Sequence, residues 1–406
     1  MLVVGRRSAV PKLEAAAASG RGRALGVTVV ALVLLMTTWF SASAVLPQLR
    51  EDWQLSNTAA AWLTIAVQLG FVAGALASSA LKLPDLIPVQ RLILVSALGA
   101  AGANALLLLV DGPELAIPLR LATGFFLAGV YPPALKLLAT WFRTGRGTAL
   151  GIAVGALTLG SAGPHLVNGL GGLDWHAVIV VTSILTLAGG LVALSVGDGP
   201  FAFPRAVFDP RQIGLVFRNR GVRLASLGYF GHMWELYAMW AWFLVFFRAA
   251  HDGGSAAAYA TFAAIGIGSI GCYVGGVLGD NWGRPQTAAL MMGLSGVCAL
   301  TIGLLLDAPT WLLLAVGLVW GFTVVADSAQ FSTMVTEFGD QAYVGTALAL
   351  QLGVGFALTS VTIWLIPFLE EEVGWRYAFA FLAPGPALGI VAMLRLARVA
   401  GTPRAA

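Results

Sequence analysis

Twelve stretches of mainly apolar residues follow one another along the chain, and short polar gaps separate them. A helix needs roughly 20 residues to cross a bilayer, because the hydrocarbon core is about 30 Å thick and each residue rises about 1.5 Å. Backbone amides inside hydrocarbon must be satisfied within their own segment, which helices achieve and open strands do not. The pattern predicts an all-α membrane protein with twelve transmembrane helices. We place them at about 24–47, 57–80, 91–110, 114–138, 147–170, 175–196, 222–247, 255–279, 286–306, 309–334, 342–367 and 375–396.

The composition excludes most soluble functions. Hydrophobic residues make up 58% of the chain and charged residues only 10%, whereas soluble domains carry about 25% charged residues. Neither a Gly-rich phosphate loop nor a paired nucleophile and base is present in the sequence, and both cysteines lie in apolar stretches. We therefore expect no enzyme activity, no cofactor, no metal site and no nucleic-acid partner.

Lysine and arginine gather in alternate gaps between the apolar stretches. One set of gaps holds most of them, while the other holds only Arg50, Arg248 and Arg376 together with many acids. Because cytoplasmic loops retain positive charge, we predict that both termini lie in the cytoplasm and that the chain spans a bacterial inner membrane many times.

The longest polar interruption divides the chain into equal halves and indicates two pseudo-symmetric six-helix bundles. Parallel halves with a substrate near the midplane are a known plan for transporters. The predicted organisation is a disordered cytosolic tail (1–23), an N-terminal bundle (24–197), a cytoplasmic linker (198–221), a C-terminal bundle (222–398) and a second cytosolic tail (399–406).

The gap after the eighth stretch carries a distinctive pattern, which runs from Gly276 through Asp280 and Gly283 to Arg284. With this pattern the chain resembles the major facilitator superfamily of transporters, and the resemblance covers nearly the whole sequence. It implies that Asp280, Gly283 and Arg284 form a gate between the two halves. The equivalent gap in the first half keeps Asp85 and Arg91 as gating candidates but lacks both glycines.

Two further segments are similar to motifs of this family. Arg120 in the fourth stretch is followed by Gly124, four residues later. The fifth stretch is rich in glycine and ends in Gly-Pro. Small residues spaced four apart let helices approach closely, and proline bends a helix. The packing and hinge candidates are Gly151, Gly155, Gly160, Gly163 and Pro164.

Ionisable residues at membrane depth are costly, and they therefore mark candidate substrate or ion sites. Arg120 could pair with a substrate anion or form a salt bridge within its bundle. His232 and Glu235 share one face of the seventh helix, with Tyr229 and Trp234 nearby. We expect Glu235 to line a cavity, the alternative being a buried structural hydrogen bond.

Five more polar residues complete the predicted pathway. Asp327, with Gln330 beside it, could take a proton or cap a broken helix. His165 follows Pro164 directly, and a histidine there could equally be a packing residue. Gln68 and Gln351 are weaker candidates, because neighbouring helices can satisfy an uncharged amide.

The leading functional hypothesis is secondary active transport of a small organic solute, an anion, by alternating access, with protons coupled through Glu235 or Asp327. We expect a monomer. One alternative is polyspecific efflux of apolar or cationic compounds, with the acids as cation sites. Another is a transporter-like sensor or assembly protein that does not transport, which the altered gap around Asp85 would suit.

Overall fold

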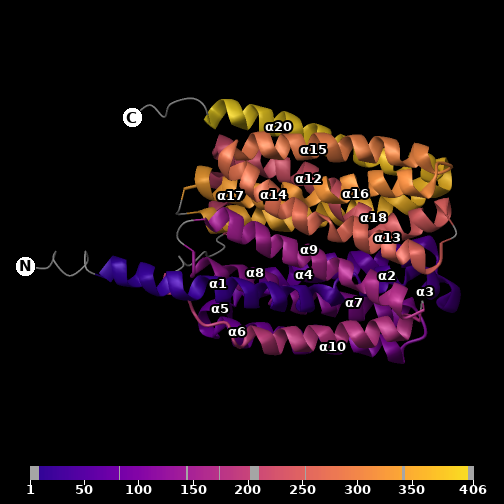
Figure 1. Cartoon of the computed structure of the whole chain (residues 1–406), viewed down its shortest axis with the longest axis horizontal. Coiled ribbons are helices and arrows are strands. Elements are labelled where there is room, and N and C mark those ends of the chain that lie inside the picture. The colour runs from indigo at the N-terminus through magenta and orange to yellow at the C-terminus, as the bar shows by residue number, and fades with distance from the viewer. Residues whose placement is uncertain are drawn as a thin grey trace, which may run out of the picture.

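A computed structural model describes residues 9–81, 83–142, 145–172, 174–201, 210–251, 253–340 and 343–400. Within these ranges the chain forms helices joined by short turns, and no strand. The long helices run side by side along one axis, and α1 begins at the same end of the molecule where α20 ends (Figure 1). We call this end the terminal side and the other end the opposite side. Parts of the predicted tails and of the predicted linker lie outside the described residues, at 1–8, 202–209 and 401–406.

The first half supplies the first six predicted spans. Its first helix begins at Ala9, so residues 9–23, which we expected to be a disordered tail, are helical here. The elements are α1 (Ala9–Leu35), η1 (Met36–Thr38), α2 (Ser41–Ala44), α3 (Leu46–Trp53), α4 (Asn57–Ala80), α5 (Leu83–Leu86), α6 (Val89–Ala105), η2 (Leu106–Leu109), α7 (Pro113–Leu127), α8 (Tyr131–Ala139), α9 (Arg146–Leu170) and α10 (Trp175–Ala193).

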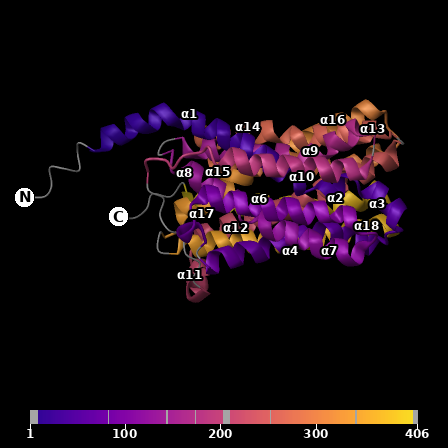
Figure 2. The ribbon, with the colours of Figure 1, turned by 90° about the horizontal axis from the view of Figure 1, so that it is seen from below.

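The second half begins after a short helical segment near the terminal side (Figure 2), η3 (Pro210–Gln212) and α11 (Ile213–Arg218). Its remaining elements are α12 (Arg220–Ala250), α13 (Ser255–Gly266), α14 (Gly268–Asn281), α15 (Arg284–Thr301), η4 (Ile302–Leu305), α16 (Thr310–Ala326), α17 (Ser328–Phe338), α18 (Val344–Val373), α19 (Trp375–Ala378), η5 (Phe379–Leu382) and α20 (Pro384–Ala400).

Eleven helical stretches in the described part of the chain are long and apolar enough to cross a membrane. The remaining predicted span is α12, which carries the ionisable residues His232 and Glu235. It is 31 residues long, and 21 of these residues are buried. The polar span is thus enclosed by its neighbours. The predicted all-α, two-bundle membrane fold is confirmed.

Several spans that the sequence predicts as single helices are broken in the structure. The first span changes to a 3₁₀ turn at η1 and restarts at α2. The tenth span stops at Ala326 and restarts at Ser328, so that Asp327 lies at the junction. A break frees backbone groups from helical hydrogen bonds. These breaks are therefore the places where polar side chains can be used.

Helix α9 lies at the boundary between the halves, against α13 and α14 (Figure 1). Its contact with α14 depends on small residues. A Cβ atom at Gly155 would lie 2.8 Å from the carbonyl oxygen of Ser269, and one at Gly151 would lie 3.0 Å from that of Cys272. Gly160 faces α1 instead, where a Cβ atom would lie 2.5 Å from the Val33 oxygen. Glycine thus allows close packing on two sides of α9.

Candidate functional site

Arg120 lies in α7 and is fully buried. Its guanidinium donates hydrogen bonds to five oxygens, and all five are uncharged. The acceptors are the backbone carbonyls of Thr38 (3.0 Å), Leu63 (3.3 Å) and Trp39, Oγ of Ser41 (3.0 Å) and Oδ1 of Asn104 (3.2 Å).

The position of these acceptors explains what Arg120 does in the structure. Thr38 and Trp39 lie between α1 and α2, where the broken first span leaves carbonyls without helical partners. A guanidinium offers five donors in a fixed planar arrangement, so one side chain can satisfy several of these oxygens together. Arg120 thereby fixes the conformation of the break and of the aromatic residues that follow it.

Asn104 in α6 extends this network through the first half. Its Oδ1 accepts a hydrogen bond from Ser41 Oγ (2.6 Å), and its Nδ2 donates to Thr182 Oγ1 (3.2 Å) and Ser183 Oγ (3.0 Å) of α10. Nδ2 also lies 3.3 Å from the carbonyl oxygen of Ile179. Helices α2, α4, α6, α7 and α10 of the first half thus share one buried polar network with a single positive charge.

An aromatic layer fills the space between the two halves, and each of its side chains is buried. Trp39 and Phe40, at the break next to Arg120, contact side chains of the second half: the Trp39 and Phe40 rings each lie 6.0 Å from the Tyr237 ring. The Phe71 and Phe356 rings, from α4 and α18, lie 4.9 Å apart. The layer consists of Trp39, Phe40, Phe71, Tyr237, Trp240 and Phe356.

Glu235 lies inside the second bundle with 1% of its surface exposed. Ser295 Oγ of α15 donates to Oε2 at 2.9 Å, and Trp320 Nε1 of α16 donates to Oε1 at 2.6 Å. Both partners are neutral donors, so the carboxyl group has no cation among these contacts. The role of Glu235 in lining the substrate pathway stays a prediction.

His232 and Asp327 form a second buried pair in the same bundle. His232 Nδ1 lies 2.8 Å from Asp327 Oδ1, and the two side chains are 1% and 2% exposed. The rings of Tyr229 and Phe331 flank the imidazole at 5.9 and 5.4 Å. Glu235 follows His232 by about one helical turn on α12. These three titratable groups form the acid cluster: His232, Glu235 and Asp327.

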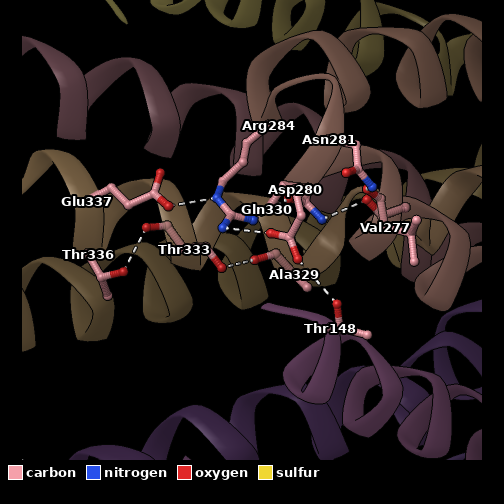
Figure 3. Close-up of polar contacts among 11 residues, drawn as sticks. Thr148, Val277, Asp280, Asn281, Arg284, Ala329, Gln330, Thr333, Thr336 and Glu337 are labelled. Atoms are coloured by element: carbon pink, nitrogen blue, oxygen red, sulfur yellow. Dashed lines mark hydrogen bonds and ion pairs between the residues drawn. The ribbon is translucent and has the colours of Figure 1, made fainter. Parts of the chain in front are cut away.

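The gate predicted after the eighth span forms a network at the terminal side (Figure 3). Arg284 lies between two acids: Nη2 is 3.0 Å from Asp280 Oδ1, and Nε is 2.8 Å from Glu337 Oε1. Nη1 donates to Gln330 Oε1 at 3.0 Å. Gly283 precedes α15 with a φ of +115°, a conformation that only glycine adopts readily. The three predicted gate residues are thus brought together.

Asp280 connects this network to the first half. Its Oδ2 accepts a hydrogen bond from Thr148 Oγ1 of α9 at 3.2 Å, and Figure 3 shows the carboxylate directed toward Thr148. Thr148 belongs to the first turn of α9, where the helix dipole favours a negative charge. A Cβ atom at Gly147 would lie 3.0 Å from Asp280 Oδ1, so glycine permits the approach.

The first-half counterpart is described only in part. Asp85 belongs to the short helix α5, and its side chain lies outside what the structure describes. Arg91, in the first turn of α6, is exposed. Their role in gating remains a prediction.

The other predicted pathway residues fall into two groups. His165, Gln68 and Gln351 are buried, and neither polar atom of each side chain has a hydrogen-bond partner. By contrast, Trp234 donates through Nε1 to the Phe381 carbonyl at 3.2 Å, within its own bundle. Among the described residues, no three His, Cys, Asp or Glu side chains come together to hold a metal ion.

Sequence reasoning missed several partners of the predicted residues. Asn104 could have been noticed as an amide within an apolar span, but Ser295 and Trp320 gave no signal of their own. The aromatic layer was also missed, because its members come from separate spans and look like ordinary membrane aromatics.

Two bundles of membrane-spanning helices, a polar network that joins them and buried ionisable groups are the features expected of a membrane transporter. The sequence model of the Major Facilitator Superfamily matches residues 28–362, and the chain belongs to this family. The resemblance inferred from the gate motif is therefore confirmed.

Two relatives show what this chain is similar to. The multidrug efflux pump LfrA of Mycolicibacterium smegmatis is 30% identical over 291 residues, which cover 70% of this chain and 51% of that protein. The ectoine/proline transporter ProP of Corynebacterium glutamicum is 30% identical over 152 residues, 33% of this chain and 30% of that protein. The chain thus matches about half, or less, of the length of these relatives.

Proposed function

We propose that this protein exports apolar, cationic organic compounds in exchange for protons, by alternating access. The observation that carries the proposal is the separation of buried charges. The only positive charge in the Arg120 network is held by five neutral oxygens of its own half. The acid cluster in the other half contains two carboxyl groups and one histidine.

This separation favours a cationic substrate over the anion that the sequence first indicated. An anion would need a cation that is free to face it, and the donors of Arg120 are already engaged. A cation can exchange with protons at carboxyl groups, because protonation removes the negative charge that holds it. The similarity to the multidrug efflux pump LfrA supports this choice.

The aromatic layer suits the same class of substrate. Trp, Tyr and Phe faces attract organic cations, by about 0.5–2 kcal/mol per favourable contact. The unpartnered indole N–H groups of Trp39 and Trp240 offer further hydrogen-bond donors beside these faces. We infer that substrate enters between the halves by separating this layer.

Alternating access requires contacts between the halves that can be broken on each side. On the terminal side, Asp280 bonds Thr148. On the opposite side, Asn57 Nδ2 donates to Glu371 Oε1, and the Arg50 guanidinium lies 5.7 Å from the Trp242 ring. The excess of basic residues near the terminal side supports a cytoplasmic location for both termini in a bacterial inner membrane. We expect the protein to act as a monomer without enzyme activity.

Transport by the purified chain in liposomes tests the proposal. With an acidic lumen and an alkaline bath, proton efflux should drive tetraphenylphosphonium into the vesicles, as measured with an ion-selective electrode. Accumulation should disappear when an ionophore collapses the proton gradient. Glu372→Gln, at an exposed acid near the end of α18, is a matched control that should leave accumulation unchanged.

Two outcomes would contradict the proposal. Accumulation of organic anions but not of cations would support the hypothesis, first drawn from the sequence, that the substrate is an anion. No flux of any tested solute, combined with a ligand-induced rise in thermal stability, would indicate a sensor rather than a transporter.

A further inference from the structure

Gln330 lies between Asp327 of the acid cluster and Arg284 of the gate network. It belongs to the first turn of α17, and its backbone N–H donates to the carbonyl oxygen of Asp327 at 2.9 Å. Its side chain is 1% exposed. Gln330 is therefore bound to the residue at the helix break, and its amide is shielded from water.

Both ends of the Gln330 amide are engaged. Nε2 donates to the carbonyl oxygen of Gly275 in α14 at 3.1 Å, and Oε1 accepts from Arg284 Nη1 at 3.0 Å. An Asn or Ser side chain would be too short to span the same two partners. The amide thus joins α17 to the middle of α14 and to Arg284, the central cation of the gate network.

The facing surface of α14 leaves almost no room for movement of this amide. A Cβ atom at Gly279 would lie 2.2 Å from Gln330 Oε1, and one at Gly275 would lie 1.9 Å from the Ala326 carbonyl oxygen. Because the helices touch here without intervening side chains, a shift of the α16–α17 junction must move Gln330 against α14 or against Arg284.

Arg284 passes such a shift to the contact between the halves. It is shared by Asp280, Glu337 and Gln330 (Figure 3), and Asp280 alone of these reaches across to Thr148. If the Gln330 acceptor moves away, Arg284 can pair more fully with one acid or the other. The position of Asp280 relative to α9 then changes.

We propose that Gln330 is a positioning residue that couples the charge state of the His232–Asp327 pair to the Asp280–Thr148 contact between the halves. The inference rests on the proposed proton-coupled function and adds to it the path by which a buried proton alters the gate. Around Asp327 lie its partner His232 of α12, Glu235 about one turn further along α12, and Cys272 of α14, whose thiol donates to the Val325 carbonyl oxygen at 3.6 Å. The groups facing the gate end of Gln330 are Arg284 and, through it, Asp280 and Glu337.

A double-mutant cycle tests this coupling. Asp327→Asn imitates the protonated acid, and Gln330→Met removes both polar atoms of the amide while keeping nearly the same volume. Spin labels at Leu86→Cys and Arg395→Cys, both exposed and near the terminal side in opposite halves, report the separation of the halves. The native Cys272 and Cys298 are buried and are left in place.

We expect Asp327→Asn alone to change the ratio of open to closed distances by about fivefold or more, the usual range of allosteric coupling. In the Gln330→Met background the same substitution should change the ratio by less than about twofold. Gln286→Ala is the matched control, because this glutamine lies near Arg284 in α15 and its Oε1 has no hydrogen-bond partner. The Asp327→Asn effect should survive in that background.

Additive effects of Asp327→Asn and Gln330→Met would overturn the inference, as would a distance ratio that Asp327→Asn does not change in any background. If Gln330→Met fails to fold, Gln330→Glu replaces it, since it retains the volume but adds a third carboxylate beside Arg284. In the Gln330→Glu background, the ratio of open to closed distances should be the same whether residue 327 is Asp or Asn. A ratio that still changes with Asp327→Asn would contradict the coupling. Proton-driven flux in liposomes is measured separately, so that failure of the coupling and failure of the proposed function can be told apart.

Discussion

The two halves of the molecule share an architecture but bury their charges in different ways. The first half holds one cation, Arg120, and surrounds it with neutral oxygens from a broken helix. The second half holds Glu235, bonded to two neutral donors, and Asp327, paired with a histidine. An arginine stays protonated at any physiological pH, whereas carboxyl groups and histidine can gain or lose protons.

This difference separates two roles that a transporter must combine. In the first half, a permanent charge keeps an irregular backbone in place and so positions Trp39 and Phe40 at the boundary. In the second half, groups with changeable charge lie on α12 and beside the break at Asp327. Under the proposed function, the first half would present a fixed surface and the second half would respond to protons.

The largest expected effect comes from removing the changeable charges. Glu235→Gln and Asp327→Asn should each abolish proton-driven accumulation, because a neutral amide cannot release a proton to exchange for substrate. Exchange of labelled for unlabelled substrate should persist, since it needs no net proton movement. Liposome flux measures both. Accumulation equal to that of the parent protein in either variant would remove that acid from the mechanism.

The second effect concerns the fixed half. Arg120→Met should destabilise the fold, because each buried oxygen left without a partner costs about 1–3 kcal/mol. The stability of Arg120→Lys should lie between that of Arg120→Met and that of the parent protein, since an ammonium group offers fewer donors than a guanidinium. Thermal unfolding in detergent gives the unfolding temperatures of the three proteins and so ranks their stabilities. If Arg120→Met were as stable as the parent but lost transport, Arg120 would act on substrate rather than on the backbone.

The boundary itself should show a moderate effect. Tyr237→Ala or Phe356→Ala should weaken binding of an organic cation by about three- to tenfold, through loss of aromatic faces. A neutral ligand of similar size should lose less affinity. Titration calorimetry with matched cationic and neutral ligands measures the difference. Equal losses for both ligands would indicate that the layer contributes only apolar contact.

The smallest effect should come from an exposed charge pair that belongs neither to the Arg120 network nor to the acid cluster. Arg376 pairs with Asp307 at an exposed position near the opposite side, with Asp307 83% exposed. Asp307→Asn should change stability by no more than about 1 kcal/mol and should leave flux unchanged, because exposed pairs contribute little. A large loss of flux would show that the opposite side also depends on this pair.

The sequence predicts the parts of this account that depend on local pattern. The spans follow from runs of apolar residues, and the gate at Asp280 and Arg284 follows from residues close together in the chain. The burial of Glu235 follows from its place in the middle of a span. These features need no knowledge of which helices are neighbours.

The rest depends on tertiary contacts. The break at η1 appears in a continuous apolar run, and it is held by Arg120 from a helix some 80 residues away in sequence. The pairing of His232 with Asp327 joins α12 to a distant break. The aromatic layer forms only when the two halves meet. Because the separation between partners is long, neither periodicity nor spacing could indicate them.

The central claim is that the second half exchanges protons for a cation, and the number of protons released on binding tests it most directly. Titration of the detergent-solubilised protein with tetraphenylphosphonium, in buffers of different ionisation enthalpy, gives this number. We predict net proton release by the parent protein and by Arg120→Lys, and none when Glu235→Gln and Asp327→Asn are combined. Binding without proton release by the parent, or release that persists in the combined variant, would contradict the account.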